Sequence, residues 1–171
     1  MSKAYKVLVT GAAGLLGSHF CDYLLASGHE VIGIDNLSGG YRENVPPGVT
    51  LYTNDLSDAK FVNDIMERHK FDFVYHFAAY AAVGLSPFIR NFNYTNNVLA
   101  SANLINGSIK NGVKKFIFAS SMDVYGEQTP PFTEDMKPDP QDPYGIAKYA
   151  IEMDLANAYR QFGLKYTIIR P

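Results

Sequence analysis

The chain has 171 residues, of which 47% are hydrophobic and 19% are charged, and its formal net charge is −2. These values indicate one globular domain without a basic surface for nucleic acid, and a single cysteine, Cys21, excludes an internal disulfide and a Cys-based zinc cluster. The N-terminal apolar run is too short for a signal peptide and no apolar stretch could span a bilayer, so we expect a cytoplasmic protein with no membrane association. From the charge and the single cysteine we also expect no nucleic-acid partner and no metal.

The first half of the chain alternates between short apolar runs and one-sided apolar stripes. In chain order it predicts a strand over 5–10, a helix with its stripe from Leu16 to Leu25, a strand over 30–34, a Gly- and Pro-rich link over 35–49, a strand over 50–52, and a helix capped by Ser57-Asp58 with its stripe from Phe61 to Met66. Most runs do not alternate strictly, which is typical of strands covered on both faces of a parallel sheet.

The second half continues the same order around two long connections. It predicts a strand over 71–77, a loop over 78–91, a helix over 92–111 ended by Gly112, a strand over 115–119, a Pro-rich loop over 120–143, a helix over 144–162 ended by Gly163, and a strand over 165–169. We therefore expect one Rossmann-type α/β domain over 1–171, a doubly wound parallel sheet with helices on both faces in three layers. Both long connections leave the carboxyl ends of strands, where ligands bind in such sheets.

Three glycines follow the first predicted strand and open the first predicted helix, in the segment Thr10 to Gly17. Their positions suit a tight turn, close approach of the backbone to a pyrophosphate, and close contact between helix and strand. The helix N-terminus would offer free N–H groups to the phosphates. A generic Gly-rich turn is the alternative, and the strand before and helix after favour a dinucleotide site.

Acidic residues end the second and third predicted strands. Asp35 can accept hydrogen bonds from the adenosine ribose hydroxyls and repel a 2′-phosphate, which favours NAD over NADP. A turn cap is the alternative for Asp35, and the nearby Arg42 is the counter-argument, because an arginine can serve a 2′-phosphate. Asp55 is placed for the adenine amino group, with a helix cap nearly as plausible.

Tyr144 and Lys148 stand four residues apart on a segment that Pro143 can begin as a helix, so both side chains share one helix face. A neighbouring ammonium is expected to lower the pKa of a phenol, and the pair could then exchange a proton with a substrate hydroxyl. Ser121, at the end of the fifth strand, could hydrogen-bond the reacting oxygen, and Ser120 competes for that role. His76 is interpreted as a packed strand residue near the cofactor, and Cys21 as a small packed side chain.

These segments together resemble the extended short-chain dehydrogenase/reductases, and within them the NAD-dependent sugar-nucleotide epimerases and dehydratases, with UDP-glucose 4-epimerases the most similar group. The matching pieces run in the family's order through the whole chain. They are 10–17, 35–38, 55–56, 76–79, 85–87, 93–94, 120–121, 124–126, 143–148 and 169–171.

The resemblance implies a tightly bound NAD and inversion at C4 of a UDP-hexose, such as UDP-glucose or UDP-galactose, through a 4-keto intermediate. It implies Ser121, Tyr144 and Lys148 as the catalytic residues. It also implies contacts to NAD from a larger set of residues. These are Gly11, Gly14, Leu15, Leu16, Gly17, Asp35, Asn36, Leu37, Ser38, Asp55, Leu56, Phe77, Ala78, Ala79, Asn96, Tyr144 and Lys148.

Asp123 and Met122 depart from the family pattern. The 4,6-dehydratases and the xylose-forming decarboxylases carry Glu at the position of Asp123, and the dehydratases carry Asp at that of Met122, whereas many epimerases have a small or neutral residue at 123. A dehydratase or decarboxylase therefore stays open as an alternative, and so does a non-catalytic NAD-binding module.

The resemblance carries two further expectations. The family continues beyond the position of Pro171 with a substrate-binding region, so we expect this chain to lack most contacts to UDP and to be inactive alone. We also expect a homodimer formed through the helices near 92–111 and 144–162, whose apolar residues Leu104, Ile151 and Tyr159 lie outside one narrow stripe.

Overall fold

A computed structural model describes residues 4–171, and six parallel strands form its centre. The strands are β1 (Lys6–Thr10), β2 (Glu30–Asp35), β3 (Thr50–Thr53), β4 (Phe73–His76), β5 (Lys115–Ala119) and β6 (Tyr166–Ile169). Their order is β3-β2-β1-β4-β5-β6, so the chain winds outward in opposite directions from a crevice between β1 and β4. All six predicted strands are confirmed, with ends that differ by at most two residues.

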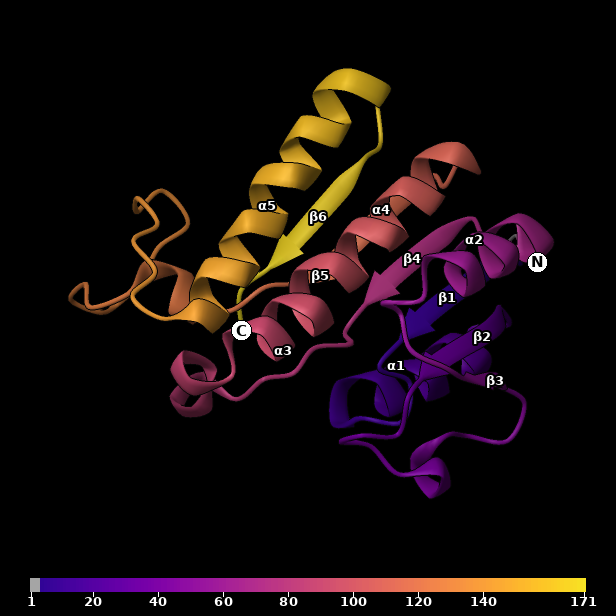
Figure 1. Cartoon of the computed structure of the whole chain (residues 1–171). Helices are drawn as coiled ribbons and strands as arrows, with labels where there is room; N and C mark the ends of the chain where they lie inside the picture. The colour runs from indigo at the N-terminus through magenta and orange to yellow at the C-terminus, as the bar shows by residue number, and fades with distance from the viewer. Residues whose placement is uncertain (1–3) are drawn as a thin grey trace.

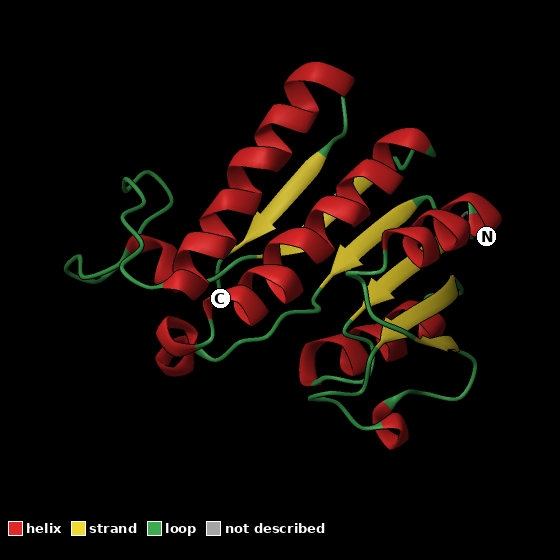
Figure 2. Ribbon diagram, viewed as in Figure 1, coloured by secondary structure: helices red, strands yellow, loops and turns green. Residues whose placement is uncertain are grey.

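Helices cover both faces of this sheet, and the predicted doubly wound, three-layer architecture is confirmed (Figures 1 and 2). The helices are α1 (Leu15–Ala26), α2 (Ala59–His69), α3 (Arg90–Tyr94), α4 (Ala100–Lys110) and α5 (Pro143–Phe162). A π-helical turn, η3 (Thr95–Leu99), joins α3 to α4, and short 3₁₀ turns lie at η1 (Arg42–Asn44), η2 (Val83–Phe88) and η4 (Met122–Tyr125). In Figure 1, α2, α4 and α5 lie in front of the sheet and α1 lies behind it.

Local sequence signals set the ends of these helices. The Asp58 side chain accepts from the backbone N–H of Phe61 and caps α2, as predicted. Pro143 is the first residue of α5, and Gly163 ends α5 in the left-handed region with φ of 73°. α5 therefore begins at the position that puts Tyr144 in its first turn.

The core has two layers because strand side chains alternate between faces. Leu8 of β1 joins the layer under α2, α4 and α5, whereas its neighbours Val7 and Val9 pack against Cys21 and Leu24 of α1. Burial raises the pKa of the Cys21 thiol to about 12, in keeping with a packed side chain. Within residues 4–171, no helix is both long and apolar enough to cross a membrane.

Candidate active site

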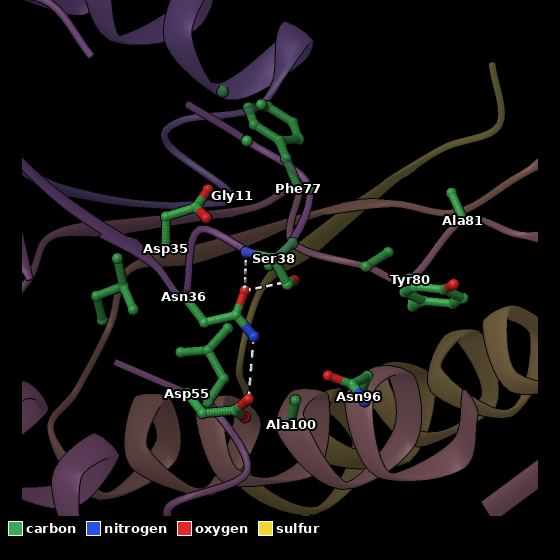
Figure 3. A pocket seen from close by; sticks show the side chains of 18 of the residues that line it. Gly11, Asp35, Asn36, Ser38, Asp55, Phe77, Tyr80, Ala81, Asn96 and Ala100 are labelled. Atoms are coloured by element: carbon green, nitrogen blue, oxygen red, sulfur yellow. Dashed lines mark hydrogen bonds between the residues drawn. The ribbon is translucent and has the colours of Figure 1, made fainter. Parts of the chain in front are cut away.

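A cleft of about 510 Å³ opens where β1, β2, β3 and β4 end. Figure 3 shows its walls: the loop at Gly11 below α1, the polar residues that follow β2 and β3, and the chain that leaves β4 at Phe77. Fourteen of the predicted cofactor residues line it. They are Gly11, Gly14, Leu15, Leu16, Gly17, Asp35, Asn36, Ser38, Asp55, Leu56, Phe77, Ala78, Ala79 and Asn96.

The structure does not bring every predicted residue to this cleft. Leu37 does not line it and instead takes a left-handed backbone conformation with φ of 59°, and Tyr144 and Lys148 belong to a separate group beside it. The sequence analysis missed eight lining residues, all but Ala100 adjacent in the chain to predicted ones or to one another. These are Ile34, Gly39, Gly40, Asn54, Tyr80, Ala81, Ala82 and Ala100.

The three glycines of the loop have different neighbours. A Cβ at Gly11, whose φ is +70°, would lie 2.7 Å from the backbone nitrogen of Ala78, and a Cβ at Gly17 would lie 2.0 Å from the carbonyl oxygen of Gly11. A Cβ at Gly14 would meet only that same carbonyl oxygen, at 3.3 Å. Gly11 and Gly17 therefore hold the loop against β4 and α1, whereas Gly14 leaves room in the cleft for a ligand to approach the backbone.

The N-terminus of α1 supplies donors to the same place. Among the residues that the structure describes, no acceptor meets the backbone N–H groups of Leu15, Leu16 and Gly17, and Gly14 provides no side-chain cap. Free N–H groups and the partial positive charge of a helix N-terminus together favour a phosphate. The space beside the Gly14 backbone and these three N–H donors fit the pyrophosphate of a dinucleotide.

The polar side chains after β2 and β3 form the other end of the cleft. Asp35 accepts from the backbone N–H groups of Ala13 at 2.9 Å and Leu37 at 2.8 Å, so its carboxylate is fixed while each oxygen keeps a further lone pair. Asn36 donates to Asp55 at 3.0 Å, as Figure 3 shows. Burial raises the pKa of Asp55, but hydrogen bonds from Ser57 and Asn36 outweigh this and hold it below its ordinary value.

Arg42, which could have bound a 2′-phosphate, lies outside the cleft. Its guanidinium donates to the Thr53 hydroxyl at 2.7 Å, and it does not line the cleft. The acidic pair Asp35 and Asp55 therefore sets the charge at this end. This arrangement fits the uncharged ribose hydroxyls of NAD better than a phosphate.

Ser121, Tyr144 and Lys148 come together at the end of β5. Lys148 Nζ lies 5.6 Å from the centre of the Tyr144 ring, and the Ser121 side chain is close enough to the Tyr144 phenol to act on its pKa. Ser120, the competing residue, donates to Glu152 instead. All three residues of the group are buried, with exposed fractions of 8%, 7% and 3% for Ser121, Tyr144 and Lys148.

The expected lowering of the Tyr144 pKa is wrong for this structure. Burial raises that pKa, a hydrogen bond from Ser121 opposes the rise, and the charges of Asp123 and Asp142 add to it, so the net direction is upward. Lys148 Nζ donates to the carbonyl oxygen of Ala119 at 2.7 Å, and burial lowers its own pKa to about 8. In the folded chain Lys148 therefore lowers the pKa of Tyr144 less than their four-residue spacing suggested.

A buried chain of hydrogen bonds connects β1, β4 and the π-helical turn. Ser101 Oγ donates to the carbonyl oxygen of Asn97, so it must accept from His76 Nε2, 2.8 Å away. Burial and the charge of Lys148 lower the pKa of His76 to about 3, so the ring is neutral and its Nδ1 accepts from Thr10 Oγ1 at 2.7 Å. His76 is thus a packed structural residue with one defined tautomer, as interpreted from the sequence.

Two asparagines extend this chain to the helix that carries Tyr144. Asn97 accepts from the backbone N–H of Tyr80 at 2.8 Å and donates to Asn93 Oδ1 at 2.8 Å, and Asn93 donates to the carbonyl oxygen of Pro143 at 2.9 Å. Tyr80 lines the cleft, and Pro143 begins α5. Buried amides therefore fix the cleft relative to the group formed by Ser121, Tyr144 and Lys148.

The low pKa of His76 predicts a pH-dependent stability. Below about pH 6.5 the unfolded chain takes up a proton on this ring that the folded chain cannot take until about pH 3, so the free energy of unfolding falls over that range by about 1.4 kcal/mol per pH unit. His76→Gln should lower the free energy of unfolding at pH 7. It should also remove the part of the pH dependence of that free energy that the ring causes. Urea unfolding between pH 7 and pH 4 measures it, with His19→Gln as an exposed control. Parallel curves for the wild type and His76→Gln would contradict the assignment.

Residues 7–171 match the model of the NAD dependent epimerase/dehydratase family. UDP-glucose 4-epimerases from Azospirillum brasilense and Lactobacillus helveticus are 36% and 38% identical to the chain over 166 residues. These matches cover 96% of the chain but 48% and 50% of the two relatives, so the chain spans about half their length.

Solved structures give the same result. The UDP-glucose 4-epimerase of Thermotoga maritima, solved with UDP-glucose, superposes with a TM-score of 0.94 at 42% identity. The UDP-glucose 4-epimerase of Thermus thermophilus, solved in complex with NAD, superposes with a TM-score of 0.92 at 38% identity. Each match covers 96% of this chain and 54% of the solved chain.

Proposed function

This chain belongs to the NAD dependent epimerase/dehydratase family, and on that premise we propose that it holds NAD in the cleft and inverts C4 of a UDP-hexose through a 4-keto intermediate. One observation carries the proposal: buried amides join the cleft, which is lined by the glycine loop and Asp35, to the helix that bears Tyr144 and Lys148. The names of the relatives, UDP-glucose 4-epimerases, support UDP-glucose and UDP-galactose as the pair of sugars.

The cleft residues would hold NAD by distinct contacts. The N–H groups of Leu15, Leu16 and Gly17 would donate to the pyrophosphate, and Asp35 would accept from the adenosine ribose hydroxyls. When bound, NAD accepts a hydride from the sugar carbon and returns it. Because the Asp35 carboxylate repels a 2′-phosphate, NAD should bind at least about tenfold more tightly than NADP.

The catalytic group would handle the proton that accompanies the hydride. Tyr144 would take the proton from the 4-hydroxyl as C4 is oxidised, and would return it when the 4-keto sugar is reduced on its other face. Ser121 would hydrogen-bond the reacting oxygen. Lys148 would hold the cofactor ribose, and burial of the group excludes water from the reaction.

The test is to load the 171-residue chain, and any longer protein that contains it, with NAD and add UDP-galactose. We expect both proteins to bind NAD more tightly than NADP. The longer protein should form UDP-glucose with a transient absorbance of reduced cofactor at 340 nm, whereas the 171-residue chain alone should form little product. A product that has lost water or CO₂ would replace the epimerase proposal with the dehydratase or decarboxylase alternative. Failure to bind NAD would refute the assignment of the cleft.

We also propose that the protein forms a homodimer through α3, α4 and α5. Two of the apolar residues that suggested this interface, Leu104 and Ile151, are buried in the core of the chain and cannot reach a partner. Other apolar side chains on the same helices and the turn between them are exposed and supply a surface in their place. They are Phe92 (48% exposed), Leu99 (46%), Ile146 (41%), Met153 (51%) and Tyr159 (54%).

A charge on this surface should separate the subunits. Met153→Glu places a carboxylate on the exposed face of α5, two helical turns from Ile146, and is expected to convert a dimer into a monomer because an unpaired charge would be buried at the interface. Sedimentation at micromolar concentration measures the mass. Tyr23→Glu, on α1 behind the sheet, is the control and should leave the dimer intact. A wild-type protein that sediments as a monomer would refute the proposal.

A further inference from the structure

A buried carboxylate lies on the helix face that carries Tyr144 and Lys148. Glu152 stands one turn beyond Lys148 on α5 and is 5% exposed. Its two oxygens accept from three donors: the Ser120 hydroxyl and Arg170 Nε meet Oε1, and Arg170 Nη2 meets Oε2. Glu152 takes no part in the proposed proton transfer, so its burial and its three partners point to a different role.

Arg170 joins this carboxylate to the end of β6 and to the turn η4. Its guanidinium forms a bidentate pair with Glu152, in which Nε lies 2.9 Å from Oε1. The third nitrogen, Nη1, donates to the Tyr125 hydroxyl at 2.7 Å. Arg170 therefore uses all three nitrogens on two partners, and one network of hydrogen bonds links α5, β6 and η4.

The backbone around Ser121 is paired with the backbone around Arg170. The N–H groups of the residues before and after Ser121 donate to the carbonyl oxygens of the residues before and after Arg170, at 2.7 Å and 3.2 Å. These bonds continue the pairing of β5 with β6 beyond Ala119. A displacement of Arg170 would therefore carry the backbone of Ser121 with it.

Side chains of α5 hold the same segment. Lys148 Nζ donates to the Ala119 carbonyl oxygen at 2.7 Å, and one turn farther Glu152 accepts from the Ser120 hydroxyl. The two residues that precede Ser121 in the chain are thus bonded to two consecutive turns of the helix. These bonds set how far the segment lies from α5.

We infer that Glu152 and Arg170 form a clamp that positions Ser121 relative to Tyr144. Neither residue lines the cofactor cleft, and both act through the segment 120–122, so they are positioning residues. This role rests on the proposed function, in which Ser121 hydrogen-bonds the reacting oxygen. Because misplacement of a reacting group by about 1 Å can lower a rate by about 10²-fold, the clamp acts on the chemical step rather than on binding of the cofactor.

The first test needs neither cofactor nor sugar. Hydrogen exchange of the Ser120 N–H, which donates to Ile169, is compared with that of Leu8, a fully buried residue of the interior strand β1. Glu152→Gln removes the charge that pairs with Arg170 and should speed exchange at Ser120 by about tenfold or more relative to Leu8, through local opening. An equal increase at both residues would show a loss of overall stability alone and overturn the clamp.

Two further variants complete this test. Asp72→Asn breaks the ion pair with Lys114 at the opposite end of β4, and should leave the exchange ratio unchanged. Glu152→Met together with Arg170→Met serves where Glu152→Gln does not fold, because apolar residues of similar volume can replace a buried ion pair without loss of the fold. The pair of replacements should also speed exchange at Ser120. A ratio equal to that of the wild type, or the same change with Asp72→Asn, would contradict the inference.

The second test uses the rate of NAD reduction by UDP-galactose in a longer protein that contains the chain. Glu152→Gln should lower kcat by about 10- to 10²-fold. The affinity for NAD should not change, because Glu152 does not line the cleft. In a Ser121→Ala background most of the loss in kcat should vanish, because the residue that the clamp positions has lost its hydroxyl. An equal loss in both backgrounds would show a general structural effect and rule out the clamp.

The two tests separate the clamp from the proposed function. If the wild type forms no reduced cofactor, the proposed function fails, whereas the exchange ratio still decides whether Glu152 and Arg170 hold the segment 120–122. If Glu152→Gln reduces NAD at the wild-type rate, the clamp is overturned and the proposed function stands.

Discussion

Tyr144→Phe is expected to reduce epimerisation, and the reduction of bound NAD by a UDP-sugar, by about 10²- to 10⁴-fold while the affinity for NAD changes little. The substitution removes one oxygen from a side chain that is 7% exposed and does not line the cofactor cleft. In the proposed mechanism that oxygen exchanges a proton with the sugar, and general acid–base catalysis contributes this range of rate. Stability should change little, because the ring still fills its site.

The measurement is the absorbance at 340 nm after UDP-galactose is mixed with the NAD-loaded protein, together with separation of the two UDP-sugars. Tyr149→Phe, five residues farther along α5, is the matched control and should keep the wild-type rate. A Tyr144→Phe protein that interconverts the sugars at the wild-type rate would move the proton chemistry to another residue.

Gly17→Ala is expected to abolish NAD binding and to lower the free energy of unfolding by about 3 kcal/mol, the upper end of the cost of forcing a methyl group into a packed site. The new Cβ would lie 2.0 Å from the carbonyl oxygen of Gly11 and 2.9 Å from the Cα of Ala12, and both are backbone atoms that move only with the loop. Displacing α1 also moves the three N–H groups that would meet the pyrophosphate.

Gly14→Ala separates the two effects. Its Cβ would meet only the Gly11 carbonyl oxygen, at 3.3 Å, so urea unfolding should change by less than about 1 kcal/mol while NAD affinity falls, because the methyl group occupies the open floor of the cleft. Gly84→Ala, with no heavy atom within 4 Å of its Cβ, is the control for both measurements. Equal NAD affinity in Gly14→Ala and the wild type would show that the pyrophosphate does not approach this residue.

The sheet could be predicted from sequence because its signals are local. Continuous apolar runs define all six strands, and Asp58, Pro143 and Gly163 each act within one turn of the helix end that they set. The strand order follows from the alternation of strands and helices, since right-handed crossovers leave few arrangements. The glycines and acidic residues at strand ends then indicate where the cleft lies.

What could not be predicted depends on contacts between distant segments. The raised pKa of Tyr144 results from burial and from the carboxylates of Asp123 and Asp142, whereas the four-residue spacing to Lys148 indicated the opposite direction. The burial of Leu104 and Ile151 likewise depends on how α4 and α5 pack on the sheet. Asp123 could be noticed in the sequence as a departure, but its bond to Ser121 needs the turn at η4.

The π-helical turn makes the chain intolerant of a one-residue deletion at a place where no charged or catalytic side chain stands. In η3 the backbone N–H of Ala100 reaches back five residues to Thr95, which lets one extra residue sit between α3 and α4. Removing Val98 would restore an ordinary helix but rotate everything before it by about 100°. Asn93 would leave the Pro143 carbonyl, and the first turn of α5 would lose its anchor. In a library of single-residue deletions, variants that lack one residue of 95–99 should therefore be rare among the folded proteins. Variants that lack one residue of the exposed stretch 133–135 should remain common.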